Sequence, residues 1–241
     1  MMRFRINARP RVLFGLFLVI ALIGTLPMRL ALGMLGLDRE GLSLRAADDS
    51  VWAATLREVH WGDVDLGDSY AALSPVQLLV GRARVDLSGA QLGQGAPLRG
   101  AFSVSAASFG IDDTTAAVPV GQLFAPLPIT QLDLNDLSVR FDRGRCARAN
   151  GRVKAMLGAG IAGIALDQGM SGEARCVAGA LSLPLASQSG AEKIALTIEG
   201  DGQYRALLEV QGGDPATVER LTQAGFVAVG GGYRLSVEGR L

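Results

Sequence analysis

The sequence contains little of what most enzymes use for catalysis. It has one histidine, His60, two cysteines, and aromatic residues make up 5% of the chain. A Ser-His-Asp triad would depend on His60 alone, and no G-x-S-x-G sequence is present to hold a nucleophile. Two thiols and one distant imidazole cannot supply the four ligands of a structural zinc site. We therefore predict a non-enzymatic protein with no catalytic residue, no metal site and no cofactor.

An excess of charge of either sign is also missing. Lys and Arg number 23, Asp and Glu number 23, and the formal net charge is zero. Nucleic-acid-binding domains normally carry a basic excess, so we expect no nucleic-acid partner. The acidic pairs Asp48-Asp49 and Asp112-Asp113 are followed by Ser or Thr. This context favours turn and cap positions over acid–base catalysis.

The N-terminal segment lacks acidic residues before Asp38 and contains a long apolar run. Residues 12–28 are uncharged, and the apolar run resumes after Arg29 and ends at Leu37. With Arg29 reaching the headgroups, a helix that uses part of this extension can cross a hydrocarbon core of about 30 Å. We predict a transmembrane anchor over residues 12–36, which Pro27 would bend or end.

The charges around this run set its orientation. Arg3, Arg5, Arg9 and Arg11 precede it, so the positive-inside rule makes residues 1–11 a cytoplasmic arm and exports residues 38–241 to the periplasm. The competing interpretation is a cleavable signal peptide, because residues 31–33 form a small-x-small site. Both interpretations export the main domain across the inner membrane.

The two cysteines, Cys146 and Cys176, agree with an oxidising compartment. An even number of cysteines in such a compartment predicts a disulfide. A redox pair would need a C-x-x-C spacing, which these residues lack. We predict a structural Cys146–Cys176 disulfide.

Residues 38–241 alternate between apolar and polar side chains in short runs separated by glycine. A period of two indicates half-buried strands, and glycine-bearing pairs between alternating runs indicate hairpin turns. The expected fold is mainly β: one antiparallel, curved or sandwich-like domain, in two β halves joined near residues 117–130. The alternating runs are residues 102–105, 132–134, 137–141, 152–156, 194–199 and 233–238, and the turns are Arg143-Gly144, Asn150-Gly151, Asp201-Gly202 and Gly230-Gly231-Gly232.

Two segments depart from this pattern. Asp214-Pro215 provides an N-cap and a first helical residue, and Gly225 a stop, which predicts one short helix near residues 215–224. The run from Gly158 to Gly163 fits G-x-G-x-x-G, but glycines interrupt any helix after it. That context favours a loop over a dinucleotide site.

Basic residues gather in one segment against the single acid Asp142. They would suit an acidic partner or anionic lipid headgroups, and the alternative is the solvated face of a hairpin. The six residues are Arg140, Arg143, Arg145, Arg148, Arg152 and Lys154.

Short motifs follow one another in a set order along the chain. Val51-Trp52 comes after the arm and anchor, and residues 73–82, LSPVQLLVGR, fit L-x-P-x-x-L-L-x-G-[RK]. Two cysteines in glycine-bearing strands follow, and the chain closes with GYRLSVEGRL over residues 232–241. This order resembles the type II secretion system protein N (GspN) family.

The resemblance implies an inner-membrane accessory component of the type II secretion system, the machine that exports folded exoproteins from the periplasm to the exterior. Its partners would be other secretion components in the inner membrane or periplasm, and exposed strand edges could pair with them. A second hypothesis is an AsmA-like protein that binds or passes lipid between membranes on a similar half-apolar sheet. An open lipid trough would expose a continuous apolar strip, whereas a scaffold would bury it.

Overall fold

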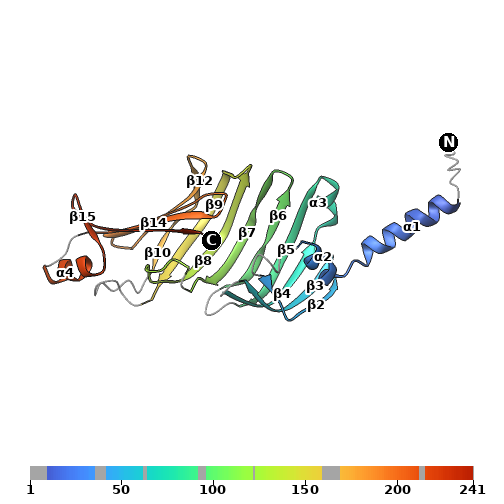
Figure 1. Ribbon diagram of the computed structural model, residues 1–241, viewed down its shortest axis with the longest axis horizontal. Coiled ribbons are helices and arrows are strands. Elements are labelled where there is room, and N and C mark those ends of the chain that lie inside the picture. Colours follow the sequence, from blue (N-terminus) through green and yellow to red (C-terminus); the bar gives the residue numbers. More distant parts are fainter. Residues whose placement is uncertain are drawn as a thin grey trace.

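The computed structural model describes residues 10–35, 42–61, 64–91, 96–121, 123–158, 169–211 and 215–240. These residues form one long, curved antiparallel sheet with a helix projecting from its N-terminal end (Figure 1). Neighbouring strands follow chain order almost throughout: β1-β3-β4-β5-β6-β7-β8-β9-β10-β12-β13-β14-β16-β15, with β2 beside β3 and β11 beside β12. The prediction of a mainly β, antiparallel domain is confirmed, in its curved rather than its sandwich-like form.

The strands divide into three groups along the sheet. The N-terminal group is β1 (Leu42–Ser43), β2 (Ala46–Ser50), β3 (Ala53–Trp61), β4 (Val64–Leu73), β5 (Arg82–Gln91) and β6 (Pro97–Ser105), with helix α3 (Pro75–Leu79) between β4 and β5. The central group is β7 (Ser108–Pro119), β8 (Ile129–Asp142) and β9 (Arg145–Leu157). The C-terminal group is β10 (Met170–Glu173), β11 (Arg175–Val177), β12 (Ala180–Ala186), β13 (Glu192–Ile198), β14 (Gln203–Gln211), β15 (Val227–Val229) and β16 (Gly232–Arg240), with helix α4 (Pro215–Gln223).

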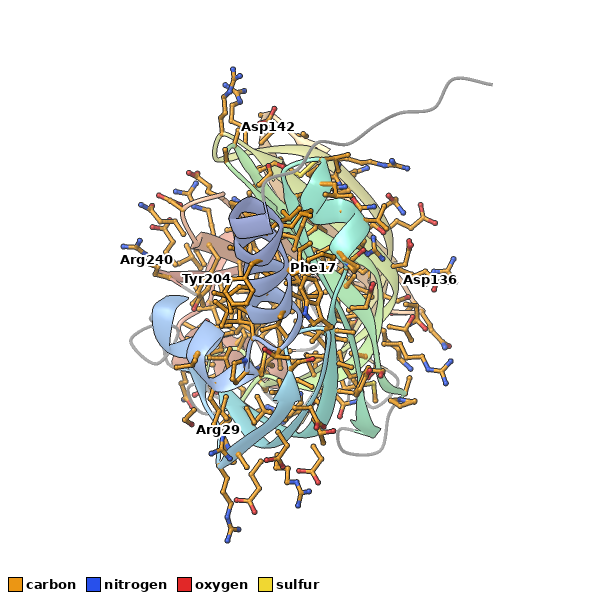
Figure 2. The ribbon with its side chains drawn as sticks, turned by 90° about the vertical axis from the view of Figure 1, so that its right-hand side faces the viewer. Phe17, Arg29, Asp136, Asp142, Tyr204 and Arg240 are labelled. Atoms are coloured by element: carbon orange, nitrogen blue, oxygen red, sulfur yellow. A yellow bond between two sulfur atoms is a disulfide. The ribbon has the colours of Figure 1, made fainter. Side chains whose placement is uncertain are left out.

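Alternation along the strands places apolar side chains on one face, which we call the inner face. Cross-strand pairing aligns Leu183 with Leu196, and Leu196 with Ala206, and all three are buried. Residues aligned in this way point to the same side of a sheet. In Figure 2 Tyr204 lies inside the curve of the sheet, whereas Asp136 points away from its outer side.

The segment between β7 and β8 covers the inner face of the C-terminal half. Val120, Phe124 and Leu127 are buried in the larger core, together with side chains of β8, β9 and β12–β14. The Tyr204 hydroxyl donates to the Leu123 carbonyl at 2.6 Å, and the Phe124 ring meets Tyr204 edge-on, with centroids 5.2 Å apart. The segment predicted only to join two β halves is therefore part of the core.

A line of bulges crosses the central strands. The register shifts where Asp113 on β7 and Asp136 on β8 adopt positive φ, each 48°, and Gly151 on β9 has φ 111°. A Cβ at Gly151 would lie 2.5 Å from the Asp136 carbonyl oxygen, so only glycine fits this approach. Bulges bend strands and increase their twist, which accounts for the curvature of the sheet here.

The strands correct two predictions. Asn150-Gly151 is not a hairpin turn but lies inside β9, and Asp48-Asp49 and Asp112-Asp113 lie inside β2 and β7. Asn, Asp and Gly tolerate left-handed backbone in a bulge as well as in a turn. The other three predicted turns and the predicted helix, α4, are confirmed. Of the predicted loop from Gly158 to Gly163, residues 159–163 lie outside the described residues.

The N-terminal segment forms two helices instead of one over residues 12–36. Helix α1 (Pro10–Gly24) ends before Pro27, and α2 (Met28–Leu35) begins directly after it. The freed carbonyls of Ile23 and Leu26 accept hydrogen bonds from Trp52 Nε1 and the Val51 amide, both 3.0 Å long. The break is therefore stabilised by the turn between β2 and β3.

Helix α2 packs on the inner face of β2–β4, where Met28 joins a second, smaller core. Arg29 donates from Nε to the Ala47 carbonyl at 2.9 Å, so its side chain is directed to the sheet. That it reaches the headgroups stays a prediction. Among the described residues no helix combines the length and apolar character needed to cross a membrane. The predicted transmembrane anchor is not confirmed.

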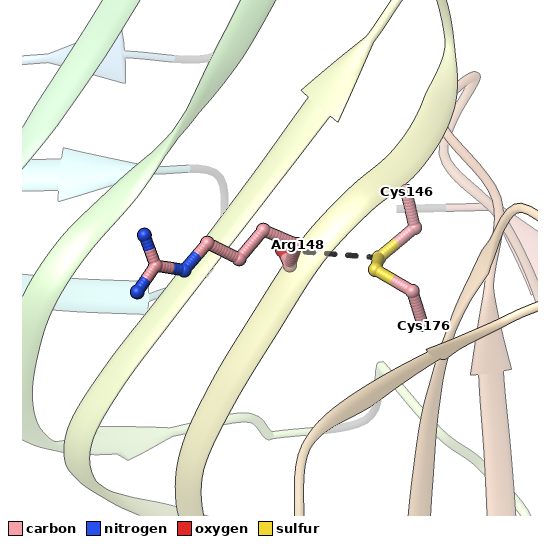
Figure 3. Close-up of a disulfide and its surroundings, with 3 residues drawn as sticks. All are labelled: Cys146, Arg148 and Cys176. Carbon is pink, nitrogen blue, oxygen red and sulfur yellow. Dashed lines mark hydrogen bonds between the residues drawn. A yellow bond between two sulfur atoms is a disulfide. The ribbon is translucent and has the colours of Figure 1, made fainter.

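The predicted disulfide is present and joins β9 to β11 (Figure 3). The Cα atoms of Cys146 and Cys176 are 5.5 Å apart, and the Cys146 sulfur lies 4.0 Å from the Arg148 carbonyl oxygen. The Cys146 amide donates to Gly179 across the same junction at 2.7 Å. The bond closes a loop of 30 residues that contains most of β9 and all of β10.

Replacing both cysteines with alanine should lower the free energy of unfolding by about 3–4 kcal/mol in the chain-entropy model. The measurement is urea denaturation of the full chain in detergent, with and without reductant. The double variant should be insensitive to reductant, and the reduced parent should resemble it. Maleimide labelling of either cysteine in the native, unreduced chain would contradict the assignment.

Tyr204→Phe should lower the free energy of unfolding by about 1–2 kcal/mol, because the Leu123 carbonyl loses its donor in a buried site. Tyr233→Phe on β16 is the matched control, since Tyr233 is half-buried and its hydroxyl bonds to no described residue. Equal losses in the two variants would show that the hydrogen bond to segment 120–128 contributes nothing specific.

Candidate interaction surfaces

A row of residues crosses the outer face of the central strands. Pairing aligns Arg84 on β5 with Ser103 on β6, Ser103 with Gly110 on β7, Gly110 with Arg140 on β8, and Arg140 with Arg148 on β9. A side chain at Gly110 would collide with the Val139 carbonyl. Small residues therefore lie at the middle of the row and long cationic ones at its ends.

Asp112, two residues along β7 from Gly110, holds the arginines in place. Its carboxylate accepts from Arg84 Nη1 at 3.3 Å, Arg140 Nη2 at 3.4 Å and Ser103 Oγ at 3.1 Å. The two guanidinium groups reach across the small residues, and Ser103 is buried beneath them. This explains how a polar residue on an outward-facing position becomes buried with its hydrogen bond satisfied.

Two further arginines complete what we call the Arg–Asp cluster: Arg82, Arg84, Asp112, Arg140 and Arg148. They line a hollow of about 250 Å³ together with Asp113, Ser138, Val139 and Asn150. Among the described residues, no carboxylate forms an ion pair with Arg82 or Arg148. Guanidinium groups with free donors bind carboxylates and phosphates in a bidentate manner, so the cluster can receive an anionic group.

The predicted basic patch is divided by this arrangement. Arg140 and Arg148 belong to the cluster. Arg152 and Lys154 lie on the same face further along β9, where Arg152 is 3.9 Å from Glu173. Arg143 occupies the β8–β9 turn, and Arg145 begins β9 with its guanidinium against Gly179. The patch as a binding site remains a prediction.

Arg82, Arg84 and Asp112 were missed by the sequence analysis. The two arginines alternate along β5 with Val85 and Ala83, a signal that they share one face. The two arginines lie near Arg140 because of how β5–β6, β6–β7 and β7–β8 are aligned. The register shifts in these pairings make that alignment hard to predict from the sequence.

The inner face is open over one short section. Phe102 and Val104 on β6 are each 42% exposed and Phe109 on β7 is 38% exposed, whereas the corresponding positions of β8, β9 and β12–β14 are buried. Phe109 stacks on Phe141, with centroids 5.1 Å apart. The apolar strip expected of a lipid trough is therefore interrupted on both sides by packed core.

The last paired strand leaves one edge open. Residues 232–240 of β16 pair with β14, but β15 covers only residues 232–234 of its other edge. Beyond that point no described strand accepts its backbone groups. Such an edge is a template for an extended segment of a partner.

The described residues contain no group of three or more His, Cys, Asp or Glu placed to hold a metal ion. The one histidine, His60, lies on β3 with Nδ1 3.0 Å from the Glu58 carbonyl oxygen. It thus occupies a strand position.

Asp112→Asn should lower the free energy of unfolding by about 1–2 kcal/mol, because the half-buried Arg140 loses its ion-pair partner and Arg84 keeps only the more exposed Asp86. Asp48→Asn is the matched control: Asp48 also lies between two arginines, Arg29 and Arg57, each at 3.5 Å, but is 43% exposed against 19% for Asp112. Exposed pairs contribute at most about 1 kcal/mol. Equal losses in urea denaturation would contradict a special role for the cluster.

Comparison with known proteins identifies the family. A family model described as "Type II secretion system (T2SS), protein N" matches residues 40–236, a range from the start of the sheet to β16. No curated protein and no solved structure matches the chain. The match covers most of the chain and agrees with the order of motifs in the sequence. The chain therefore belongs to the type II secretion system protein N family.

Proposed function

We propose that this protein is a non-enzymatic accessory component of the type II secretion system that supports export of folded exoproteins from the periplasm. The observation that carries the proposal is the family match over residues 40–236, which includes nearly the whole sheet. The sheet supplies a rigid, curved body with polar surfaces and a packed interior, features that suit a scaffold among other secretion components.

The location proposed is the inner membrane, with residues 1–11 in the cytoplasm and residues 38–241 in the periplasm. Helix α1 supports this, because its apolar side chains are exposed around the helix, Phe14 and Phe17 among them, and it projects away from the sheet (Figure 1). A helix that is apolar on every side needs an apolar environment. The N-terminal arginines favour the cytoplasmic side.

The contact to other secretion components is proposed to use the Arg–Asp cluster. Its support is geometric: Asp112 fixes Arg84 and Arg140, while Arg82 and Arg148 have free donors beside the same hollow. Because Arg84 and Arg140 are paired with Asp112, a partner's carboxylate would bind to the free donors of Arg82 and Arg148. The chemistry recognised would be an acidic side chain or an acidic segment of the partner.

The lipid-transfer alternative has no observation in its favour. It requires a continuous apolar channel along the inner face, and segment 120–128, α2 and α4 cover most of that face. The open section at Phe102, Val104 and Phe109 is bounded by core on both sides. We therefore retain the secretion scaffold as the single proposal.

A strain without this chain should retain several folded exoproteins in its periplasm, and the intact chain should restore their secretion. Complementation with Arg82→Glu plus Arg148→Glu should lower secretion several-fold at unchanged protein level, because the cluster would repel an acidic partner. The measurement is the ratio of secreted to periplasmic exoprotein.

The matched control is Arg175→Glu plus Arg240→Glu, which reverses two exposed arginines of the C-terminal strands. It should secrete as the parent does. Normal secretion in the deletion strain would overturn the proposed function. Equal secretion defects in the two double variants would show that the cluster has no specific part in the proposed function. A normal secretome with altered outer-membrane lipid would favour the lipid alternative.

A further inference from the structure

Helix α3 exposes most of its apolar side chains more than its one polar side chain, Gln77. Val76 is 68% exposed, Leu79 87% and Val80, directly after the helix, 75%. Gln77 is only half-buried, and no residue of α3 is fully buried. We call Val76, Leu79 and Val80 the α3 tip. Soluble proteins bury apolar helix faces, so this tip lacks its natural cover within the chain.

The backbone of α3 is fixed even though its side chains are exposed. The Ser74 amide donates to the Arg84 carbonyl at 2.8 Å, and the Val80 and Gly81 amides close the helix on Gln77 and Leu78. Pro75 fits the first helical turn, and Gly81 leaves it with φ 75°. The tip is thus presented on an ordered turn between two strands of the sheet.

The α3 tip lies at the same end of the molecule as α1. Figure 1 places α1, α2 and α3 together at one end, and in Figure 2 all three face the viewer. The hydrogen bonds from Trp52 to Ile23 and from Val51 to Leu26 attach the end of α1 to the β2–β3 turn. Two exposed apolar elements therefore share one end of a connected body.

The charge around the tip is one-sided. No acidic residue occurs between Asp68 and Asp86, while Arg82 follows the tip directly and Arg84 lies two residues further on. Arg84 is held by Asp86 and Asp112, but Arg82 has no ion-pair partner among the described residues. An apolar tip next to a free cation matches the boundary between lipid headgroups and acyl chains.

We propose that the α3 tip inserts into the periplasmic leaflet of the membrane that holds α1. This inference rests on the proposed anchoring of α1. Interfacial apolar side chains enter about 5–10 Å into the headgroup region, a depth that one helical turn can reach. The tip gives the sheet a second attachment point, separate in sequence from the anchor.

The test places a fluorescent probe on the intact chain in nanodiscs of phosphatidylethanolamine and phosphatidylglycerol. Leu79→Cys receives an environment-sensitive dye, and the native cysteines do not react because they form the disulfide. Val227→Cys is the matched control, since Val227 is also an exposed apolar residue (66%) but lies on β15, at the other end of the sheet. Leu18→Cys, in α1, reports the anchor. The readout is quenching by lipids that carry a nitroxide near the headgroup, for position 79, or deep in the acyl chain, for position 18.

The proposal expects quenching and a blue-shifted emission at positions 18 and 79, with neither at position 227. Quenching at position 18 without quenching at position 79 overturns the α3 contact and leaves the anchor intact. No quenching at either position overturns the anchor and this inference with it. A third outcome also overturns the proposal. If the dye at position 79 is shielded from an aqueous quencher in native membranes but is not quenched by the labelled lipid in nanodiscs, the tip contacts a protein partner and not the lipid.

Discussion

The apolar inner face of the sheet must be covered along its length, and the remaining features of the fold depend on how this is done. Transfer of apolar side chains out of water is the main favourable term in folding, but a single open sheet cannot bury a face against itself without bending. Here the bulges at Asp113, Asp136 and Gly151 bend the central strands. The disulfide then joins β11 to β9.

Different elements supply the cover at the two ends. Helix α2 covers the N-terminal strands, whereas segment 120–128 and α4 cover the C-terminal ones. Tyr204 links the second cover to the sheet through one hydrogen bond and one ring contact. Because the two covers do not meet, Phe102 and Val104 on β6 stay partly exposed between them. A packed interior of this kind is more typical of a scaffold protein than of a protein that passes lipid along its inner face.

Local patterns predicted most of the strands because strand periodicity is itself local. The alternating runs at 102–105 and 194–199 belong to β6 and β13, and the period of two follows from the backbone geometry alone. Asp201-Gly202 and Asn150-Gly151 look alike in sequence, yet only the first is a turn. The difference is a neighbour: Gly151 faces the bulge at Asp136, a residue distant in sequence, and no local pattern contains that information.

The Arg–Asp cluster shows the same limit at the level of a site. The basic run from Arg140 to Lys154 is visible in the sequence. Which of its residues join the cluster, which lie further along β9 and which lies in the turn depends on the pairing of β8 with β9 and on its bulges. Arg84 and Asp112 join Arg140 through pairings that accumulate over three hairpins. A shift of one residue in any of them would send a side chain to the opposite face, so composition alone could not place the cluster.

The proposed membrane contacts and the proposed cluster are connected by the stiffness of β5. Arg82 and Arg84 are at the start of β5, shortly after α3. β5 itself pairs with β4 on one edge and with β6 on the other. A domain attached to the membrane by one helix can rotate about the membrane normal and tilt where α1 ends before Pro27, whereas a second insertion at the α3 tip restricts the tilt. Restricting the tilt fixes the height and direction of the outer face that bears Arg140 and Arg148. An acidic partner that is itself anchored in the same membrane would then meet the cluster at a high effective concentration, and this makes the α3 contact a condition for recognition and not only for attachment.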